Sequence, residues 1–153
     1  MSILGIGPLL AIVAVATTIA VIVLERLTGS AWPLPSPWRD WGFFMGIALL
    51  IVGVFFWISA GLQVKRAFGS HQLVTIGVFR LSRNPMYAGF ILFIIPGIAL
   101  IANDLMVIVI SATMFVAFKA RIKREEEFLA GEFGEKYERY RTSVAQLIPF
   151  IHL

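Results

Sequence analysis

The chain alternates between long apolar runs and short polar segments. The first run, Ile3 to Leu24, holds 22 residues without a charge, and a second charge-free run extends from Trp41 to Val64. About 20 apolar residues are enough to cross a bilayer as a helix. The first run also lacks the basic start and the small-residue cleavage site of a signal peptide. Both runs are therefore predicted to be membrane-spanning helices.

The segment between these runs, Glu25 to Asp40, is predicted to be an extended loop. It contains three prolines, which interrupt helical hydrogen bonding. Trp32, Trp38 and Trp41 flank these prolines, as expected for aromatic anchors at a membrane surface.

A third apolar run, Pro85 to Phe118, is too long to be one span. Its only charge is Asp104. As one helix its 34 residues would reach about 51 Å, whereas the hydrocarbon core is roughly 30 Å thick. A turn is therefore expected at Asn103-Asp104, giving a hairpin of two helices. Pro96 and Gly97 should bend the first of them.

Composition supports a membrane protein. Hydrophobic residues make up 59% of the chain and charged residues 14%, whereas a soluble domain is about half apolar and about a quarter charged. The predicted fold is an all-α integral membrane protein with four transmembrane helices and a cytosolic amphipathic C-terminal helix. We expect one domain, residues 1–153, in which 1–64 form two N-terminal spans and 65–153 hold nearly all the polar side chains.

The distribution of basic residues predicts the orientation. Four spans place both termini and the segment Lys65 to Arg83 on one side, together with 11 of the 13 basic residues. The other side keeps only Arg26 and Arg39. By the positive-inside rule, the termini are expected to be cytosolic. The basic residues border apolar runs, so anionic membrane lipid is a better partner than nucleic acid.

Several kinds of site are excluded by residue type. The chain has no cysteine, which excludes disulfides, thiolate metal sites and cysteine nucleophiles. Its two histidines, His71 and His152, do not form a metal-binding constellation, so no metal is expected. The chain also lacks a phosphate-binding glycine loop and a serine triad arrangement.

Two polar segments are expected to meet at the cytosolic surface, because the hairpin returns the chain to the same face. They surround Arg83 to Tyr87 and Arg121 to Glu127. Their meeting could form a pocket between water and lipid, but any helical hairpin brings its flanks together. Pro85 suits the first turn of the hairpin helix and Asn84 its N-cap. The free N–H groups that follow could bind a carboxylate, or the turn could simply be a capped helix.

The second polar segment has the pattern of an amphipathic helix. Apolar residues recur there at helical spacing, namely Ile122, Leu129, Phe133, Tyr137, Tyr140 and Val144. Arg121 and Glu125, four residues apart, lie at the edge of this stripe, whereas Glu126 lies within it. An edge position can reach a ligand. The alternative is a surface helix with an ordinary salt bridge and an apolar face resting on the membrane.

The two segments together resemble the isoprenylcysteine carboxyl methyltransferase family, which is similar in its catalytic half to the membrane phospholipid methyltransferases. The first matching block runs from His71 to Arg80 and continues through Arg83-Asn84-Pro85-Met86-Tyr87 to Gly89. The second comprises Arg121, Glu125-Glu126, Leu129, Phe133-Gly134, Tyr137, Tyr140 and Ile148-Pro149. The resemblance covers roughly residues 60 to 151 and makes 65–153 the expected catalytic half.

The resemblance implies S-adenosyl-L-methionine as cofactor and a lipophilic, membrane-embedded methyl acceptor. The implied cofactor-binding residues are His71, Gln72, Leu73, Val74, Phe79, Asn84, Pro85, Met86, Tyr87 and Glu125. Arg121 would be catalytic, facing the acceptor. Two positions depart from the family pattern, because Asn84 replaces a usual His and Phe79 a usual Tyr. Asn cannot titrate near neutral pH, so a histidine base at position 84 is not available.

A sulfonium methyl is already activated, so positioning and exclusion of water could supply most of the acceleration. The acceptor is expected to enter from the bilayer and the cofactor from the cytosol. Prenylcysteine, phospholipid amine, quinone-like isoprenoid and small thiol all remain open as acceptors, as does the oligomeric state. Two rival functions remain: a steroid-reductase-like NADPH-dependent enzyme, which normally needs more spans, and a non-catalytic membrane scaffold subunit.

Overall fold

The computed structural model describes residues 5–29, 32–67 and 72–149, and it is helical without strands over these ranges. The α-helices are α1 (Gly7–Thr28), α2 (Ser36–Ala67), α3 (Pro85–Ala88), α4 (Ile95–Ala102), α5 (Ile108–Phe133) and α6 (Glu135–Ser143). Three shorter elements join them, the 3-10 helices η1 (Gly77–Arg80) and η3 (Leu105–Val107) and the π-helix η2 (Gly89–Ile94).

Four helical stretches are long and apolar enough to cross a membrane. They are Gly7–Thr28, Ser36–Ala67, Pro85–Ala102 and Leu105–Phe133. The third combines α3, η2 and α4, which follow one another without a break. The prediction of an all-helical membrane fold with four spans, the last two forming a hairpin, is confirmed.

The first two helices extend beyond their apolar runs. The loop predicted over Glu25 to Asp40 is shorter in the structure, because α1 continues to Thr28 and α2 already begins at Ser36. A helix keeps its backbone hydrogen bonds at the membrane surface, so it does not have to end where the apolar run ends. Gly29 ends α1 with a positive φ of 64°, a conformation that glycine adopts without steric cost.

The hairpin turns at the predicted residues. Asn103 adopts a left-handed conformation with φ 54°, and its amide donates to the carbonyls of Ala99 and Leu100. The Asp104 carboxylate then accepts a hydrogen bond from the amide of Met106 at 3.0 Å. Asn is one of the few residues that tolerate this conformation, and Asp is a favoured N-cap, so this pair ends one helix and starts the next.

The irregularity in the first hairpin helix lies just before Pro96. There the chain forms η2, with wider π-type turns, and α4 begins at Ile95. Proline has no N–H to donate, and its ring collides with the carbonyl four residues earlier. A π-type segment is one way to relieve this conflict.

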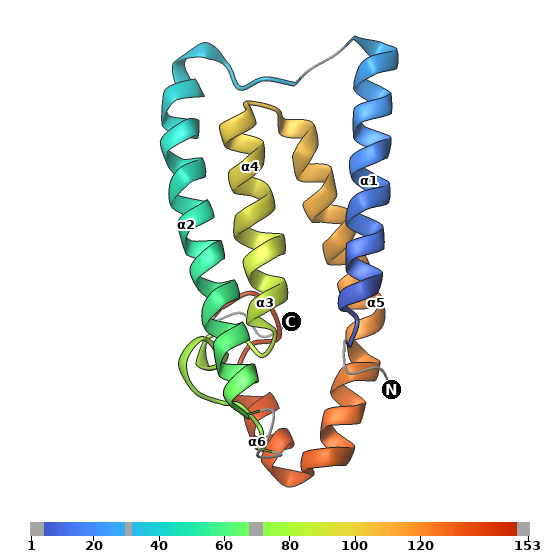
Figure 1. The fold of residues 1–153 in the computed structure, drawn as a ribbon, viewed down its shortest axis with the longest axis vertical. Helices are drawn as coiled ribbons and strands as arrows, with labels where there is room; N and C mark the ends of the chain where they lie inside the picture. The colour runs from blue at the N-terminus through green and yellow to red at the C-terminus, as the bar shows by residue number, and fades with distance from the viewer. Residues whose placement is uncertain (1–4, 30–31, 68–71, 150–153) are drawn as a thin grey trace.

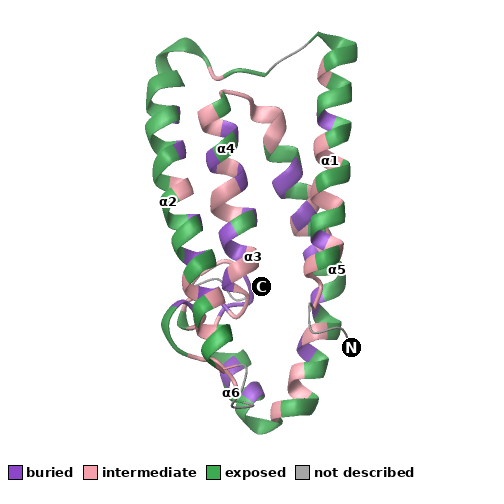
Figure 2. Cartoon of the chain, in the orientation of Figure 1, coloured by how far each residue is buried: buried purple, intermediate pink, exposed green. Residues whose placement is uncertain are grey.

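The spans form two pairs, with α2 against η2 and α4, and α1 against α5 (Figure 1). Figure 2 shows buried residues on the faces that meet and exposed residues on the outward faces. The core contains Leu10, Ala88, Ile91, Ile95, Ile110, Met114, Phe118, Ile122 and Leu147. The start of α1 and the helix α6 lie at the end opposite the α1–α2 linker (Figure 1).

Glycines allow the close approach of α2 to the hairpin. A Cβ added at Gly46 would lie 2.7 Å from the carbonyl oxygen of Gly97, and one at Gly97 would lie 2.8 Å from that of Gly46. Gly53 and Gly89 are related in the same way, each 2.9 Å from the other's carbonyl oxygen. Such small residues let backbones approach in membranes, where helix association relies on packing rather than on the hydrophobic effect.

Gly53→Ala is expected to destabilise the protein by about 1–3 kcal/mol, because the added methyl collides with backbone that cannot move freely. The matched control is Gly61→Ala in the same helix, where nothing lies within 4 Å of the added Cβ. That control should be neutral or slightly stabilising, since alanine favours helix. Melting temperatures in detergent would check the pair, and equal values would contradict this packing.

The C-terminal part differs from a single amphipathic helix. The segment from Arg121 to Phe133 is the continuation of α5, and the chain then bends at Gly134, whose φ is 54°. The separate polar helix is the nine-residue α6. The bend turns α6 back toward the hairpin, where Tyr137 and Tyr140 are buried.

Candidate functional site

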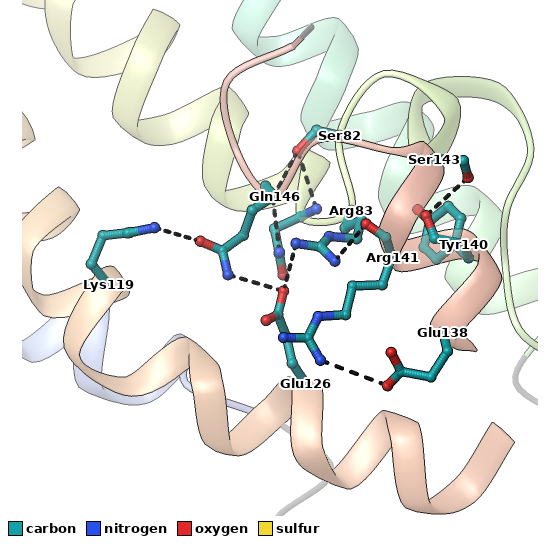
Figure 3. A network of polar contacts seen from close by, with 10 residues as sticks. Ser82, Arg83, Lys119, Glu126, Glu138, Tyr140, Arg141, Ser143 and Gln146 are labelled. Carbon is teal, nitrogen blue, oxygen red and sulfur yellow. Dashed lines mark hydrogen bonds and ion pairs between the residues drawn. The ribbon is translucent and has the colours of Figure 1, made fainter. Parts of the chain in front are cut away.

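The two polar segments meet, as expected, at the end of the hairpin. Arg83 Nη2 lies 3.1 Å from Glu126 Oε1, and both side chains are less than a tenth exposed. Arg83 also donates from Nη1 to the carbonyl of Arg141 at 3.1 Å, and its backbone N–H donates to Ala145 at 2.8 Å. Through these three interactions, Arg83 joins the residues before α3 to α5, to α6 and to the chain that follows α6 (Figure 3).

Gln146 is the hub of the surrounding network (Figure 3). Its side-chain Nε2 donates to Glu126 Oε1 at 3.0 Å, and its Oε1 accepts from Lys119 Nζ at 2.8 Å. Its backbone carbonyl accepts from Asn84 Nδ2 at 2.9 Å and from Ser82 Oγ at 3.3 Å. The network fixes the turn that leads into α3.

Two tyrosines of α6 complete this frame. The Tyr140 hydroxyl donates to the carbonyl of Phe79 at 2.6 Å. Burial raises the pKa of Tyr140 above its ordinary value, so its phenol remains a donor. Burial, and next the charge of Glu126, raises the pKa of Tyr137 to about 12. Both phenols therefore stay protonated near neutral pH and contribute to the structural frame.

Glu125 is separate from this network and faces α1. Its Oε2 accepts a hydrogen bond from the backbone N–H of Ile6 at 3.3 Å. Ile6 is the N-cap of α1, so the carboxylate lies at the positive end of that helix. Gly5 packs closely against it, since a Cβ there would lie 2.9 Å from Glu125 Oε1.

Tyr87 of α3 lies between α5 and the start of α1. Its ring packs against that of Phe118 in α5, with centroids 5.7 Å apart. Its hydroxyl oxygen lies 3.8 Å from the position of a Cβ at Gly7. Tyr87 and Glu125 therefore border the same short turn, Gly5–Gly7, at which α1 begins.

A cavity of about 670 Å³ extends from this turn between α1 and the hairpin. Gly7, Met86 and Tyr87 line one end, and Glu25 and Asp104 line the other. The rest of its lining is almost entirely apolar, including Leu10, Ala14, Trp57, Phe90, Ile94 and Met114. The cavity follows about 27 Å of α1, from residue 7 to residue 25. This size and lining are typical of a small-molecule site.

The predicted site residues fall into three groups. Met86 and Tyr87 line the cavity, and Glu125 lies half-buried beside them. Pro85 is buried, and Asn84 occupies the N-cap position but uses its amide nitrogen for Gln146 rather than for the helix. The remaining described residues do not line the cavity: Leu73, Val74 and Phe79 are half-buried, and Gln72 and Arg121 are exposed. His71 lies outside the described residues.

Several residues that shape this end of the molecule were missed by the sequence reasoning. Ile6 acts through its backbone N–H, which no side-chain pattern reports. Gln146 lies in the irregular chain after α6, beyond the helical stripe. Lys119 and Glu126 could have been recognised in the sequence. Lys119 is a basic residue at the end of an apolar run, Glu126 is a carboxylate within an apolar stripe, and both therefore need polar partners.

Comparison with known proteins identifies the family. A family model described as phospholipid methyltransferase matches residues 41–136. A probable protein-S-isoprenylcysteine O-methyltransferase from Oryza sativa subsp. indica is 31% identical over 139 residues, covering 84% of this chain and 72% of the relative. Protein-S-isoprenylcysteine O-methyltransferase A from Arabidopsis thaliana is also 31% identical, over 73% of this chain and 61% of the relative.

A solved structure agrees with this assignment. It is that of a eukaryotic intramembrane Ras methyltransferase, an isoprenylcysteine carboxyl methyltransferase, with TM-score 0.66 and 26% identity. The match covers 95% of this chain but 53% of the other, so the chain spans about half the length of that protein. The chain therefore belongs to the isoprenylcysteine carboxyl methyltransferase family of membrane proteins, and its residues 41–136 also match the phospholipid methyltransferase family model.

Proposed function

We propose that the protein is an S-adenosyl-L-methionine-dependent methyltransferase whose acceptor is a lipophilic molecule held in the bilayer. One observation carries this proposal. Tyr87 and Glu125 come from the two family-matched segments; Tyr87 lines one end of a long apolar cavity, and Glu125 contacts the turn Gly5–Gly7 at that end. A polar group at the end of an apolar channel suits a ligand with a reactive head and a hydrocarbon tail.

The residues beside this cavity fit the proposed cofactor. Glu125 Oε2 is bonded to Ile6, and a carboxylate has further lone pairs that can accept from ligand hydroxyl or amino groups. Its negative charge also complements a cationic sulfonium. We propose that Glu125 and the turn Asn84–Tyr87 bind the cofactor, with Gln72 to Val74, Phe79 and His71 toward its adenosine end. The cofactor supplies an activated methyl group.

The rest of the chemistry falls to positioning by this chain. The apolar lining excludes water from the acceptor, and Met86 and Tyr87 bound the point where the acceptor would approach. Glu126 is already paired with Arg83, so it is not free to remove a proton. An ionised carboxylate acceptor needs no base, which favours an isoprenylcysteine-like carboxylate over an amine. Arg121 is proposed to face that carboxylate.

A second candidate is a non-catalytic membrane subunit that has kept the scaffold. The observation favouring it is that the Asn84 side chain donates to the backbone of Gln146, which is a structural role. Calorimetry with S-adenosylhomocysteine and with NADPH separates the candidates. The proposed enzyme binds S-adenosylhomocysteine. It also transfers the labelled methyl group of S-adenosyl-L-methionine to an acceptor in a lipid extract of the native host. A scaffold does neither, and a reductase binds NADPH.

We also propose that both termini and the candidate site face the cytosol, because 11 of the 13 basic residues lie on that side. Reporter fusions at residue 35 and at residue 153 should therefore report opposite sides of the membrane. The fusion at residue 153 should be cytosolic. The same sidedness for both would contradict the four-span topology.

A further inference from the structure

The turn Gly5–Gly7 contacts both the Glu125 carboxylate and the apolar cavity. On one side, the Ile6 N–H binds Glu125 at 3.3 Å. On the other side, Gly7 lines the apolar cavity together with Met86 and Tyr87. Both contacts come from the start of α1 and its N-cap residue, which precede the region matched by the family model, residues 41–136.

We propose that this turn of α1 belongs to the reaction centre and that Ile6 is a positioning residue, whose backbone N–H orients the Glu125 carboxylate toward the cofactor. This inference rests on the proposed function and deepens it. Among the described residues, the Glu125 carboxylate is held by the hydrogen bond from the Ile6 N–H to Oε2, which restricts the side chain, and in this proposal the ligand binds the other oxygen. Preorganisation of this kind spares a site the entropy of ordering the side chain when the ligand binds.

The glycines on either side of Ile6 support this role. At Gly5, the positive φ of 54° and the 2.9 Å from an added Cβ to Glu125 Oε1 both disfavour a side chain. The backbone can therefore approach the carboxylate closely. At Gly7, an added Cβ would make only ordinary contact with Tyr87 at 3.8 Å. Glycine is therefore required at position 5, beside Glu125, whereas position 7, beside the cavity, has room for a Cβ.

The test removes the N–H without removing the turn. Ile6 has φ −85°, near the value that proline requires, so Ile6→Pro deletes the donor with little change of backbone. Ile6→Ala is the control, because it loses the same packing but keeps the N–H. We expect Ile6→Pro to weaken S-adenosylhomocysteine binding about tenfold, the loss expected from one hydrogen bond to a charged group. Ile6→Ala should stay within about twofold of the native affinity.

Two further measurements make the result decisive. Adding Ile6→Pro to Glu125→Gln should cause no further loss of affinity, because both changes act through one carboxylate. If Ile6→Pro does not fold, Gly5→Ala should weaken binding, whereas Gly61→Ala in α2, where nothing lies within 4 Å of the added Cβ, should not. Equal affinities for Ile6→Pro and Ile6→Ala, or for the two glycine variants, would overturn the role of the turn while leaving the proposed function intact. Absence of binding by the native chain would overturn both.

Discussion

Glu126→Ala is expected to destabilise the protein by about 3–5 kcal/mol. Glu126 and Arg83 form an ion pair at 3.1 Å with side chains only 8% and 9% exposed. Removing the carboxylate leaves the Arg83 guanidinium buried without a compensating charge, and Arg83 Nε already has no hydrogen-bond partner among the residues that the structure describes. Gln146 also loses the acceptor of its side-chain N–H. Unfolding in detergent, followed by circular dichroism, would measure the loss.

The neighbouring residue provides the control. Glu127 pairs with Lys123 at 3.8 Å, but these side chains are 65% and 84% exposed. Such surface pairs contribute about 0–1 kcal/mol, so Glu127→Ala should melt close to the native protein. Similar destabilisation by the two alanine variants would contradict the framework role of Glu126.

A double variant separates the charge from the packing. Replacing both partners, as in Arg83→Met with Glu126→Leu, removes the pair without leaving an isolated charge. Such apolar replacements of buried ion pairs are often close to neutral. We expect the double variant to be more stable than Glu126→Ala. Lower stability in the double variant would show that the guanidinium's hydrogen bond to the Arg141 carbonyl, rather than the charge pair, dominates.

The spans and the hairpin turn could be predicted because the bilayer imposes them. A charge-free run of the right length has to be helical in lipid, and Asn103-Asp104 contains the only charge in the third run. The helix ends were less predictable, because the polar stretches Glu25–Thr28 and Ser36–Asp40 continue helices beyond the apolar runs. The bend at Gly134 was also not anticipated, since the apolar stripe passes through it without a change of spacing.

The site could be predicted in part. Placing Glu126 within the apolar stripe agrees with its 6% exposure, and Glu125 at the edge is half-buried. Arg121 is more exposed than an edge position implies. The partner of Glu125 could not be found, because Ile6 is 119 residues away and binds through its backbone. Side-chain patterns report neither tertiary proximity nor backbone donors, so the contact between Ile6 and Glu125 could be identified only in the structure.

Glu125→Gln is expected to lower the affinity for S-adenosylhomocysteine by about ten- to a hundredfold without unfolding the protein. The change removes a charge from a half-buried carboxylate, and a hydrogen bond to a charged group contributes about 1.5–3 kcal/mol. Arg121→Ala should leave that affinity unchanged and instead raise the acceptor KM or lower kcat, because Arg121 is proposed to face the acceptor. Arg124→Ala, exposed on the same helix, is the control for general loss of positive charge.

The double variant tests whether these two side chains act separately. The structure describes both residues and shows no ion pair between them; among the described residues, α5 forms the ion pairs Arg83–Glu126 and Lys123–Glu127. The effects of Glu125→Gln and Arg121→Ala should therefore add. A purely anchoring Arg121 would lower the melting temperature while the folded fraction kept normal kinetics. Equal loss of cofactor affinity in both single variants, with no further loss in the double, would reveal a coupled pair and refute the division of roles.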